Sequence, residues 1–202
     1  MEGAGRVYLS LVYPINTIKS VTVGLFEKFN FEVGVLFTQH GKKSHILLDF
    51  NEWNCLLLFN NHNTPSSSFL CEENVERENK TTVKRTRSFL QITDSNNVKF
   101  VFNKSDLTRF ADIQRLLSKY IVRLFYDQDH FKLYINQVVT QKRYVQPYFF
   151  FPSYFRGETD RHDQQLTFDR LYDELVMYGR VGEILVTPEV QCCTPSSNEH
   201  DE

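Results

Sequence analysis

The first fifty residues alternate between apolar and polar side chains with the period of β-strands. Lys19–Phe29 and Phe31–Thr38 carry apolar residues at alternate positions, so each is expected to bury one face. Arg6–Tyr13 alternates loosely and is expected to form an edge strand that ends at Pro14. Ser44–Phe50 is short and mostly apolar, as a buried strand is. The pattern predicts a sheet of consecutive strands.

The pattern changes to a helical period after the last of these strands. Asp49 and Asn51 are candidate N-caps, because their side chains can accept hydrogen bonds from the free amides of a first helical turn. Four residues then follow at helical spacing and define one helical face: Trp53, Leu56, Leu57 and Asn60.

A second strand-to-helix transition occupies residues 98–117. Sliding the first transition onto it by 54 positions places Glu52 on Asp106 and Trp53 on Leu107. The same shift places a third apolar residue, Leu56, on Phe110. We interpret this correspondence as a weak internal repeat.

Around this second transition the chain predicts a hairpin and a helix. Ser105 or Asp106 is expected to cap the helix, which continues to about Tyr126 on an apolar stripe. The hairpin consists of a strand, a turn and a returning strand, in the order Thr82–Thr93, Asp94–Asn97 and Val98–Asn103.

The C-terminal third is less regular. Phe131–Val139 is expected to add a strand, and Gln141–Phe155, rich in aromatic residues and broken by proline, fits no regular element. Gly157–Gln165 is polar and is expected to be a loop. A second amphipathic helix over Leu166–Tyr178 and a short strand over Val181–Val186 follow.

These elements predict an α+β fold of antiparallel sheets and helices, organised as two strand-strand-helix repeats. The expected organisation is a first repeat (1–60), a linker (61–80), a second repeat (81–140), a C-terminal aromatic segment with helix and short strand (141–190), and a disordered acidic tail (191–202).

Composition narrows the setting of the protein. No apolar run approaches the roughly 18 to 20 residues that a membrane helix needs, and the N-terminal residues do not resemble a secretory signal. We therefore expect an intracellular, nuclear protein without membrane association. The four cysteines show no zinc-ligand spacing, so no metal or other cofactor is expected.

Charge is distributed unevenly, although the net charge is −2. Residues 80–150 hold 13 basic and 5 acidic side chains, whereas residues 151–202 hold 4 basic and 11 acidic ones. The middle third therefore carries the positive charge that nucleic-acid binding requires.

The sequence gives little support for catalysis. It lacks the phosphate-binding glycine loops, the nucleophile elbow and the zinc-protease motif. Asp160, His162 and Asp163 lie together and resemble a metal site, which leaves a metal-dependent nuclease as a minor hypothesis. We predict that the protein is not an enzyme.

Cations and aromatic rings are interleaved on the predicted strands, as in proteins that bind single strands. Cations neutralise exposed phosphates, and flat rings stack on bases at about 1–3 kcal/mol per base. Lys84, Arg85 and Arg87 place three cations within four residues, and three such side chains are unlikely to be buried. This favours the second repeat as the nucleic-acid-binding part of the chain. The expected nucleic-acid-binding residues are Phe26, Lys28, Phe29, Lys42, Lys43, Lys84, Arg85, Arg87, Phe89 and Lys99.

Residues 21–59 resemble the single-stranded-DNA-binding domain of the transcriptional positive-cofactor family. The family pattern has a hydrophobic-x-x-Phe strand end, a Gly/Lys turn, a Lys-x-Ile-x-Leu strand and a helix that opens with Glu-Trp-x-x-Leu. They correspond here to Leu25–Phe29, Gly41–Lys43, Ile46–Leu48 and Glu52–Leu56. This first unit departs from the family pattern, because it is not basic and its second strand lacks arginine.

The resemblance implies a curved antiparallel sheet backed by a helix, single-stranded DNA as ligand, and a dimer. Two such units, each a curved antiparallel sheet backed by a helix, would form an intrachain pseudo-dimer on one chain, as in the related Whirly and Pur-alpha architectures. We therefore expect a coactivator-like protein that binds single-stranded nucleic acid, DNA rather than RNA in the first instance, in transcription or replication, with a homodimer as a further expected state. The alternative is a protein-interaction or dimerisation module without a nucleic-acid ligand.

Overall fold

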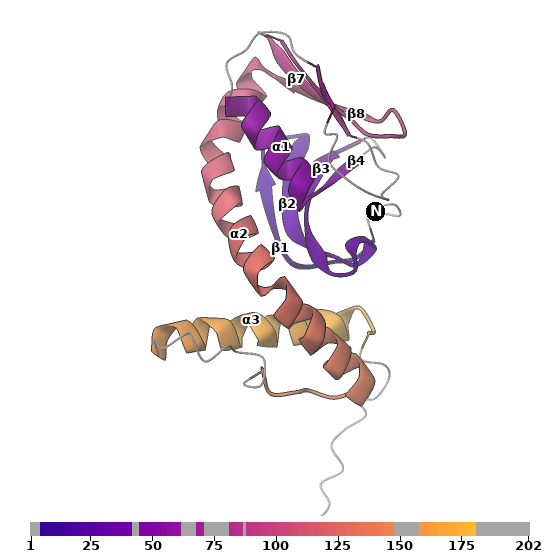
Figure 1. The fold of residues 1–202 in the computed structure, drawn as a ribbon, viewed down its shortest axis with the longest axis vertical. Helices are drawn as coiled ribbons and strands as arrows, with labels where there is room; N and C mark the ends of the chain where they lie inside the picture. The colour runs from indigo at the N-terminus through magenta and orange to yellow at the C-terminus, as the bar shows by residue number, and fades with distance from the viewer. Residues whose placement is uncertain are drawn as a thin grey trace, which may run out of the picture.

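The computed structural model describes residues 5–41, 45–61, 68–70, 81–86, 88–147 and 158–180. It contains two four-stranded antiparallel sheets and three α-helices among these residues, which confirms the α+β class. Figure 1 shows α2 running along most of the molecule, with α3 lying across its C-terminal half.

Each sheet is a meander in which consecutive strands pair, and each is followed by a helix. The first unit contains β1 (Val7–Pro14), β2 (Lys19–Phe26), the short 3-10 helix η1 (Glu27–Phe29), β3 (Glu32–Gln39), β4 (His45–Asp49) and α1 (Phe50–Asn61). The second contains β5 (Ser68–Leu70), β6 (Thr82–Arg85), β7 (Phe89–Thr93), β8 (Lys99–Asn103) and α2 (Lys104–Gln141), and α3 (Glu158–Met177) follows.

The two helices that follow the sheets begin with the same local structure 54 residues apart. The Asp49 carboxylate accepts a hydrogen bond from the Glu52 amide at 2.9 Å, and the Glu52 carboxylate accepts one from the Asp49 amide at 3.0 Å. Asn103 and Asp106 form the same reciprocal capping box at the start of α2. Asn103 is thus the cap, in place of the expected Ser105 or Asp106.

One apolar core joins both sheets and the helices. Phe37 of β3 contacts two rings of β8, with centroids 5.3 Å from Phe100 and 5.6 Å from Phe102. Phe110 of α2 closes this group at 5.0 Å from Phe102, and Trp53 of α1 meets it edge-on at 6.0 Å. All five side chains are buried, so the two units share their interior.

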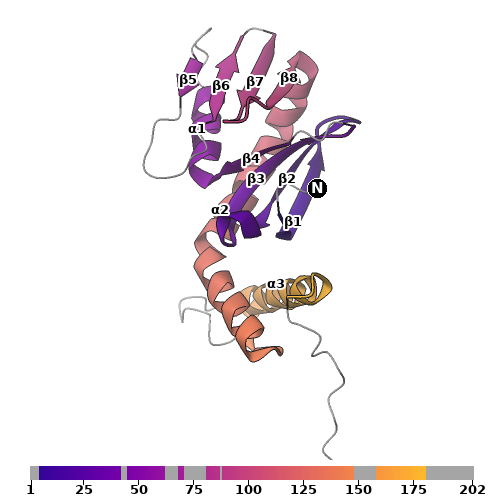
Figure 2. The ribbon, with the colours of Figure 1, turned by 90° about the vertical axis from the view of Figure 1, so that its right-hand side faces the viewer.

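We expected one helix behind each sheet, but the long helix α2 packs on both sheets. It packs on β7 and β8 of the second sheet and on β2 and β3 of the first, whereas α1 packs on β3 and β4. Figure 2 shows α2 passing from the second sheet behind the first and on to α3. At 38 residues it is about 57 Å long, which is enough to cross both sheets.

Three sequence-based assignments are wrong. The strand expected at Phe131–Val139 is part of α2, because the buried positions Phe131, Tyr134, Ile135 and Val138 recur with a helical period. The single strand expected over Thr82–Thr93 is two, β6 and β7, because the Thr86 side chain accepts from the Phe89 amide and closes a turn between them. The polar stretch expected to be a loop over Gly157–Gln165 belongs to α3 from Glu158 onward.

Two further expectations are only partly covered. The predicted linker at 61–80 contains the strand β5, which pairs with β6. The short strand predicted at Val181–Val186 and the acidic tail at 191–202 lie outside the described residues.

Helix α3 docks on an irregularity in β1. The pairing of β1 with β2 shifts between Tyr8 and Leu11, and Leu9 lies there at φ 50°. The Glu174 carboxylate of α3 accepts from the Leu9 amide at 2.5 Å, and the Tyr120 hydroxyl of α2 donates to the Leu9 carbonyl at 2.6 Å. The bulge therefore gives both helices backbone groups to bind.

Candidate nucleic-acid interface

The second sheet has one face in the core and one face toward solvent. Val83, Leu90, Ile92, Phe100 and Phe102 are buried and alternate with more exposed residues along β6, β7 and β8. We call the solvent side the open face. It carries Thr82, Lys84, Phe89, Gln91, Thr93, Lys99, Val101 and Asn103.

Three predicted binding residues meet on this open face. Lys84 lies opposite Gln91, and Lys99 lies opposite Thr93 in the adjacent cross-strand row. Both lysines are exposed, and Phe89 is half-buried at the start of β7. From strand spacing, the Cα atoms of Lys84 and Lys99 are about 12 Å apart, so the face presents two separated cations and a ring.

The other predicted rings do not fit the role expected of them. Phe26 is fully buried and Phe29 is 8% exposed, and they form a small second core with Leu36 on the outer side of the first sheet. Helix η1 folds Phe29 back over Phe26, with ring centroids 6.4 Å apart. Gly34 makes room for this, because a Cβ there would lie 2.8 Å from the Phe26 ring. These rings cannot stack on bases while so covered.

The remaining predicted cations are divided among several places. Lys28 is exposed on η1, away from the second sheet's strands. Arg85 is on the core side of β6, where it faces α2. Lys42, Lys43 and Arg87 lie outside the described residues, so their predicted contacts stay predictions.

The first sheet offers no comparable charge on its outer side. Its outer rows pair Ser20 with Thr38 and Thr22 with Leu36, and the two hydroxyls of Ser20 and Thr38 are 2.7 Å apart. Lys19 is the one lysine or arginine in strands β1 to β4, and its ammonium group is turned into the interior. Strands β1 to β4 therefore add no exposed lysine or arginine to the positive charge that the second unit carries.

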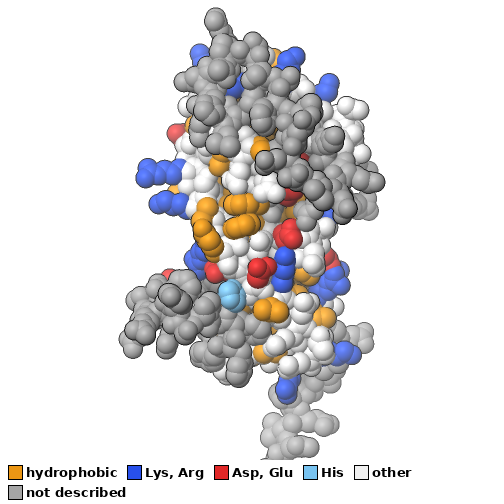
Figure 3. Space-filling view, viewed as in Figure 1, with side chains coloured by type: hydrophobic (Ala, Val, Ile, Leu, Met, Phe, Trp, Pro, Cys, Tyr) orange, Lys and Arg blue, Asp and Glu red, His pale blue; other side chains and the backbone are white. Residues whose placement is uncertain are grey.

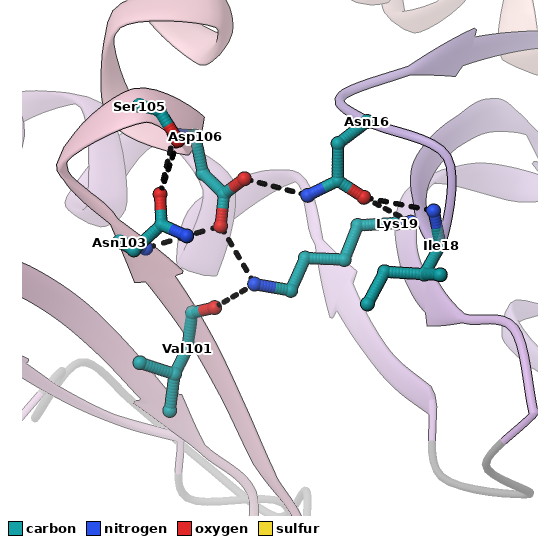
Figure 4. Close-up of polar contacts among 7 residues, drawn as sticks. All are labelled: Asn16, Ile18, Lys19, Val101, Asn103, Ser105 and Asp106. Atoms are coloured by element: carbon teal, nitrogen blue, oxygen red, sulfur yellow. Dashed lines mark hydrogen bonds and ion pairs between the residues drawn. The ribbon is translucent and has the colours of Figure 1, made fainter.

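Lys19 belongs to a buried polar cluster between the units, shown in Figure 4. Its ammonium donates to Asp106 of α2 and to the Val101 carbonyl of β8, both at 2.6 Å. Asn16 donates to the second Asp106 oxygen at 2.6 Å. Burial alone would raise the pKa of Asp106, but hydrogen bonds from Lys19, the Asn103 amide and Asn16, with the Lys19 charge, hold it below its ordinary value. The cluster is fully paired, which indicates a structural role.

A hollow of about 510 Å³ lies beside the N-terminal half of α2. Its walls carry three cations and several hydroxyl or amide groups, and they come from the end of β6 and from four successive turns of α2. The lining residues are Arg85, Lys104, Leu107, Thr108, Ala111, Gln114, Arg115 and Ser118.

The sequence carries one signal for this hollow. Its α2 residues recur at helical spacing from Lys104 to Ser118, on a side of the helix away from the buried stripe. Polar positions on a long helix usually face open solvent, so only the position of β6 shows that this side borders a hollow.

Other candidate chemistry is sparse in the part of the chain that the structure describes. No group of three or more metal-binding side chains occurs among these residues. Asp163 is exposed on α3, and the side chains of Asp160 and His162 lie outside the description, so the nuclease hypothesis is untested. No helix in the described ranges combines the length and apolar character needed to cross a bilayer.

Cys55 on α1 is half-buried and disulfide-bonded. Disulfides are rare in reducing compartments such as the nucleus. This pairing therefore weighs against the expected nuclear location, which stays a prediction.

Comparison with known protein families, curated proteins and solved structures finds no match to this chain.

Proposed function

We propose that the protein binds single-stranded nucleic acid, in the first instance DNA, through the open face of its second sheet. The observation that carries this proposal is the presence of Lys84, Lys99 and Phe89 on one solvent-facing surface. Between the cations lie hydrogen-bonding side chains of Gln91 and Thr93 rather than carboxylates. The proposed activity is binding without catalysis.

The chemistry of this face suits a flexible single strand. Such a strand exposes phosphates, which the two lysines can neutralise, and base faces, on which the Phe89 ring can stack. Neither interaction reads the base sequence, so we expect binding that tolerates many sequences and weakens with salt.

The organisation of the chain supports the same proposal. Two four-stranded meanders followed by helices with matching capping boxes are consistent with an internal duplication. We propose that the units form a pseudo-dimer in the sense of the resemblance stated above, with roles in transcription or replication. Because the cations lie in the second unit, we expect the two halves to contribute unequally.

Titration of a fluorescent single-stranded oligonucleotide tests the proposal by anisotropy. Lys84→Glu with Lys99→Glu should weaken binding about tenfold or more at low salt, because two phosphate contacts are replaced by repulsion. The slope of log affinity against log salt should fall in magnitude by about 1.4, which is two contacts at about 0.7 each for a single strand. Phe89→Ala should weaken binding without changing that slope.

The matched control is Arg109→Glu with Lys119→Glu, which makes the same change of charge at two exposed residues of α2 outside the open face. It should retain most of the wild-type affinity. Absence of salt-sensitive binding by the wild-type chain, or an equal loss in the control, would show that the open face is not the binding surface.

A second candidate is a protein-interaction or dimerisation module. Its support is a row of exposed apolar side chains on α2, namely Val122, Tyr126 and Leu133, which are 45%, 75% and 56% exposed. Figure 3 shows hydrophobic side chains gathered near the middle of the face that carries α2. A second copy of the chain is the partner that we expect there.

A further inference from the structure

The hollow beside α2 has the charge of an anion site. Arg85, Lys104 and Arg115 line it, and no aspartate or glutamate is among the described residues that line it. Lys104 and Arg115 make no ion pair with any described residue, so their charges are not neutralised within this part of the protein. Lys104 is also the first residue of α2, where the helix dipole disfavours a cation and favours an anion.

The groups between the cations suit a phosphodiester chain. Ser118 can donate a hydrogen bond to a phosphate oxygen, whereas the Thr108 hydroxyl donates to the Lys104 carbonyl at 3.2 Å. Leu107 and Ala111 give apolar contact for sugars or bases. The lining runs from Lys104 to Ser118, about 21 Å along the helix axis. A site of that length fits an extended polyanion better than a single phosphate.

The hollow adjoins the open face at two places. On β6, Lys84 points to the open face and the next residue, Arg85, lines the hollow. At the end of β8, Asn103 lies on the open face and Lys104 lines the hollow. Phe89 pairs with Asn103 at this same end of the sheet, so a ligand leaving the open face there meets the hollow next.

We propose that the hollow is a second segment of the nucleic-acid path. A single strand crosses the open face, turns over the end of the sheet at Phe89 and Asn103, and continues along α2 between Arg85, Lys104 and Arg115. This inference rests on the proposed function, because it assigns to the same ligand a longer footprint. At the spacing of about 3.4 Å per nucleotide that one strand has in stacked, duplex-like geometry, the hollow alone adds about six nucleotides to that footprint.

The test is a length series of single-stranded oligothymidylates, from 4 to about 20 nucleotides, titrated into the full chain. Wild-type affinity should rise with length until about ten nucleotides and then level off, since the open face takes about four and the hollow about six. Lys104→Gln with Arg115→Gln should level off near four nucleotides, with about tenfold weaker binding of the long strands and nearly unchanged binding of the shortest.

Arg109→Gln with Lys119→Gln is the matched control, because these exposed α2 residues do not line the hollow. It should show the wild-type length dependence. The altered side chains in both variants are exposed, and equal thermal melting of the variants and the wild type checks the fold.

Three outcomes would overturn the inference. If the Lys104 and Arg115 variant keeps the wild-type length dependence, or loses affinity equally at every length, the hollow is no part of the path while the open face can still bind. If the wild-type chain binds no oligonucleotide of any length, the proposed function fails together with it.

Discussion

At the scale of residues, the most informative interaction is the ion pair between Lys19 and Asp106. The Lys19 side chain is 11% exposed and that of Asp106 is 2% exposed, so water screens the pair little. Removing one partner of a buried pair leaves an uncompensated charge, which usually costs more than removing both.

We predict that Lys19→Met lowers the free energy of unfolding by about 3 to 5 kcal/mol at neutral pH. The double variant Lys19→Met with Asp106→Asn should be less destabilised than the single one, because no charge is then left buried. Urea unfolding followed by circular dichroism measures both. A loss below about 1 kcal/mol in the single variant would contradict a buried, coupled pair.

The same pair predicts a dependence of stability on pH. The pKa of Asp106 is lowered by folding, so its contribution is fully present above the unfolded value of about 3.9 and is lost as pH falls through the folded value. The difference in stability between wild type and Asp106→Asn should therefore shrink as pH falls below about 4. Unfolding curves from pH 7 to pH 2.5 check this, and a constant difference would contradict it.

At the scale of elements, the docking of α3 depends on the bulge in β1. Glu174 is oriented by Arg170 at 2.9 Å while it accepts from the Leu9 amide, and Arg170 itself donates to the Ser10 carbonyl at 2.8 Å. Gly24 allows the bulge to approach β2, because a Cβ there would lie 2.8 Å from the Tyr8 carbonyl oxygen.

We predict that Glu174→Ala destabilises the protein by about 1 to 3 kcal/mol, because the part-buried Leu9 amide loses its acceptor. Asp173→Ala is the control, since Asp173 is the exposed neighbour on the same helix. Thermal melting compares the two. Hydrogen exchange should show the Leu9 amide losing protection in Glu174→Ala, and protection equal to that of the wild type would contradict the assigned role.

Elements were predictable where local pattern decides them. The strands of the first sheet follow from alternation over residues 19–38, and α1 from the period after Asp49. The helical structure of Phe131–Val139 was not predictable, because its apolar residues fit both the strand period and the helical period over a few positions. Only the continuity of α2 decides for the helix. The burial of Phe26 was not predictable from the sequence either, because it depends on η1 folding back over the sheet.

At the scale of the whole molecule, the candidate interface was predictable only in part. Lys84, Phe89 and Lys99 share a face because strand alternation fixes their side. The same alternation sends Arg85 to the other side, against α2, which neighbouring cations in a sequence do not reveal. The hollow is lined both by Arg85 of β6 and by residues of α2, and no local pattern shows that these two elements lie side by side.

The exposed apolar row on α2 gives a prediction for the assembled protein. If two copies associate through it, Tyr126→Gln with Leu133→Gln should convert a dimer to a monomer in sedimentation velocity while leaving the melting temperature nearly unchanged. Nucleic-acid binding by the open face should persist in the variant. A wild-type chain that stays monomeric at high micromolar concentration would exclude this association.

The shared aromatic core around Phe37 and Phe102 limits how the protein can be dissected. A fragment that ends after α1 would expose Phe37, which the second half covers in the intact chain. A fragment that starts at β6 would leave Asp106 without the Lys19 ammonium group that pairs with it. We therefore expect that neither half folds on its own. Either fragment should therefore aggregate or be degraded, because it exposes core residues that the other half covers in the intact chain.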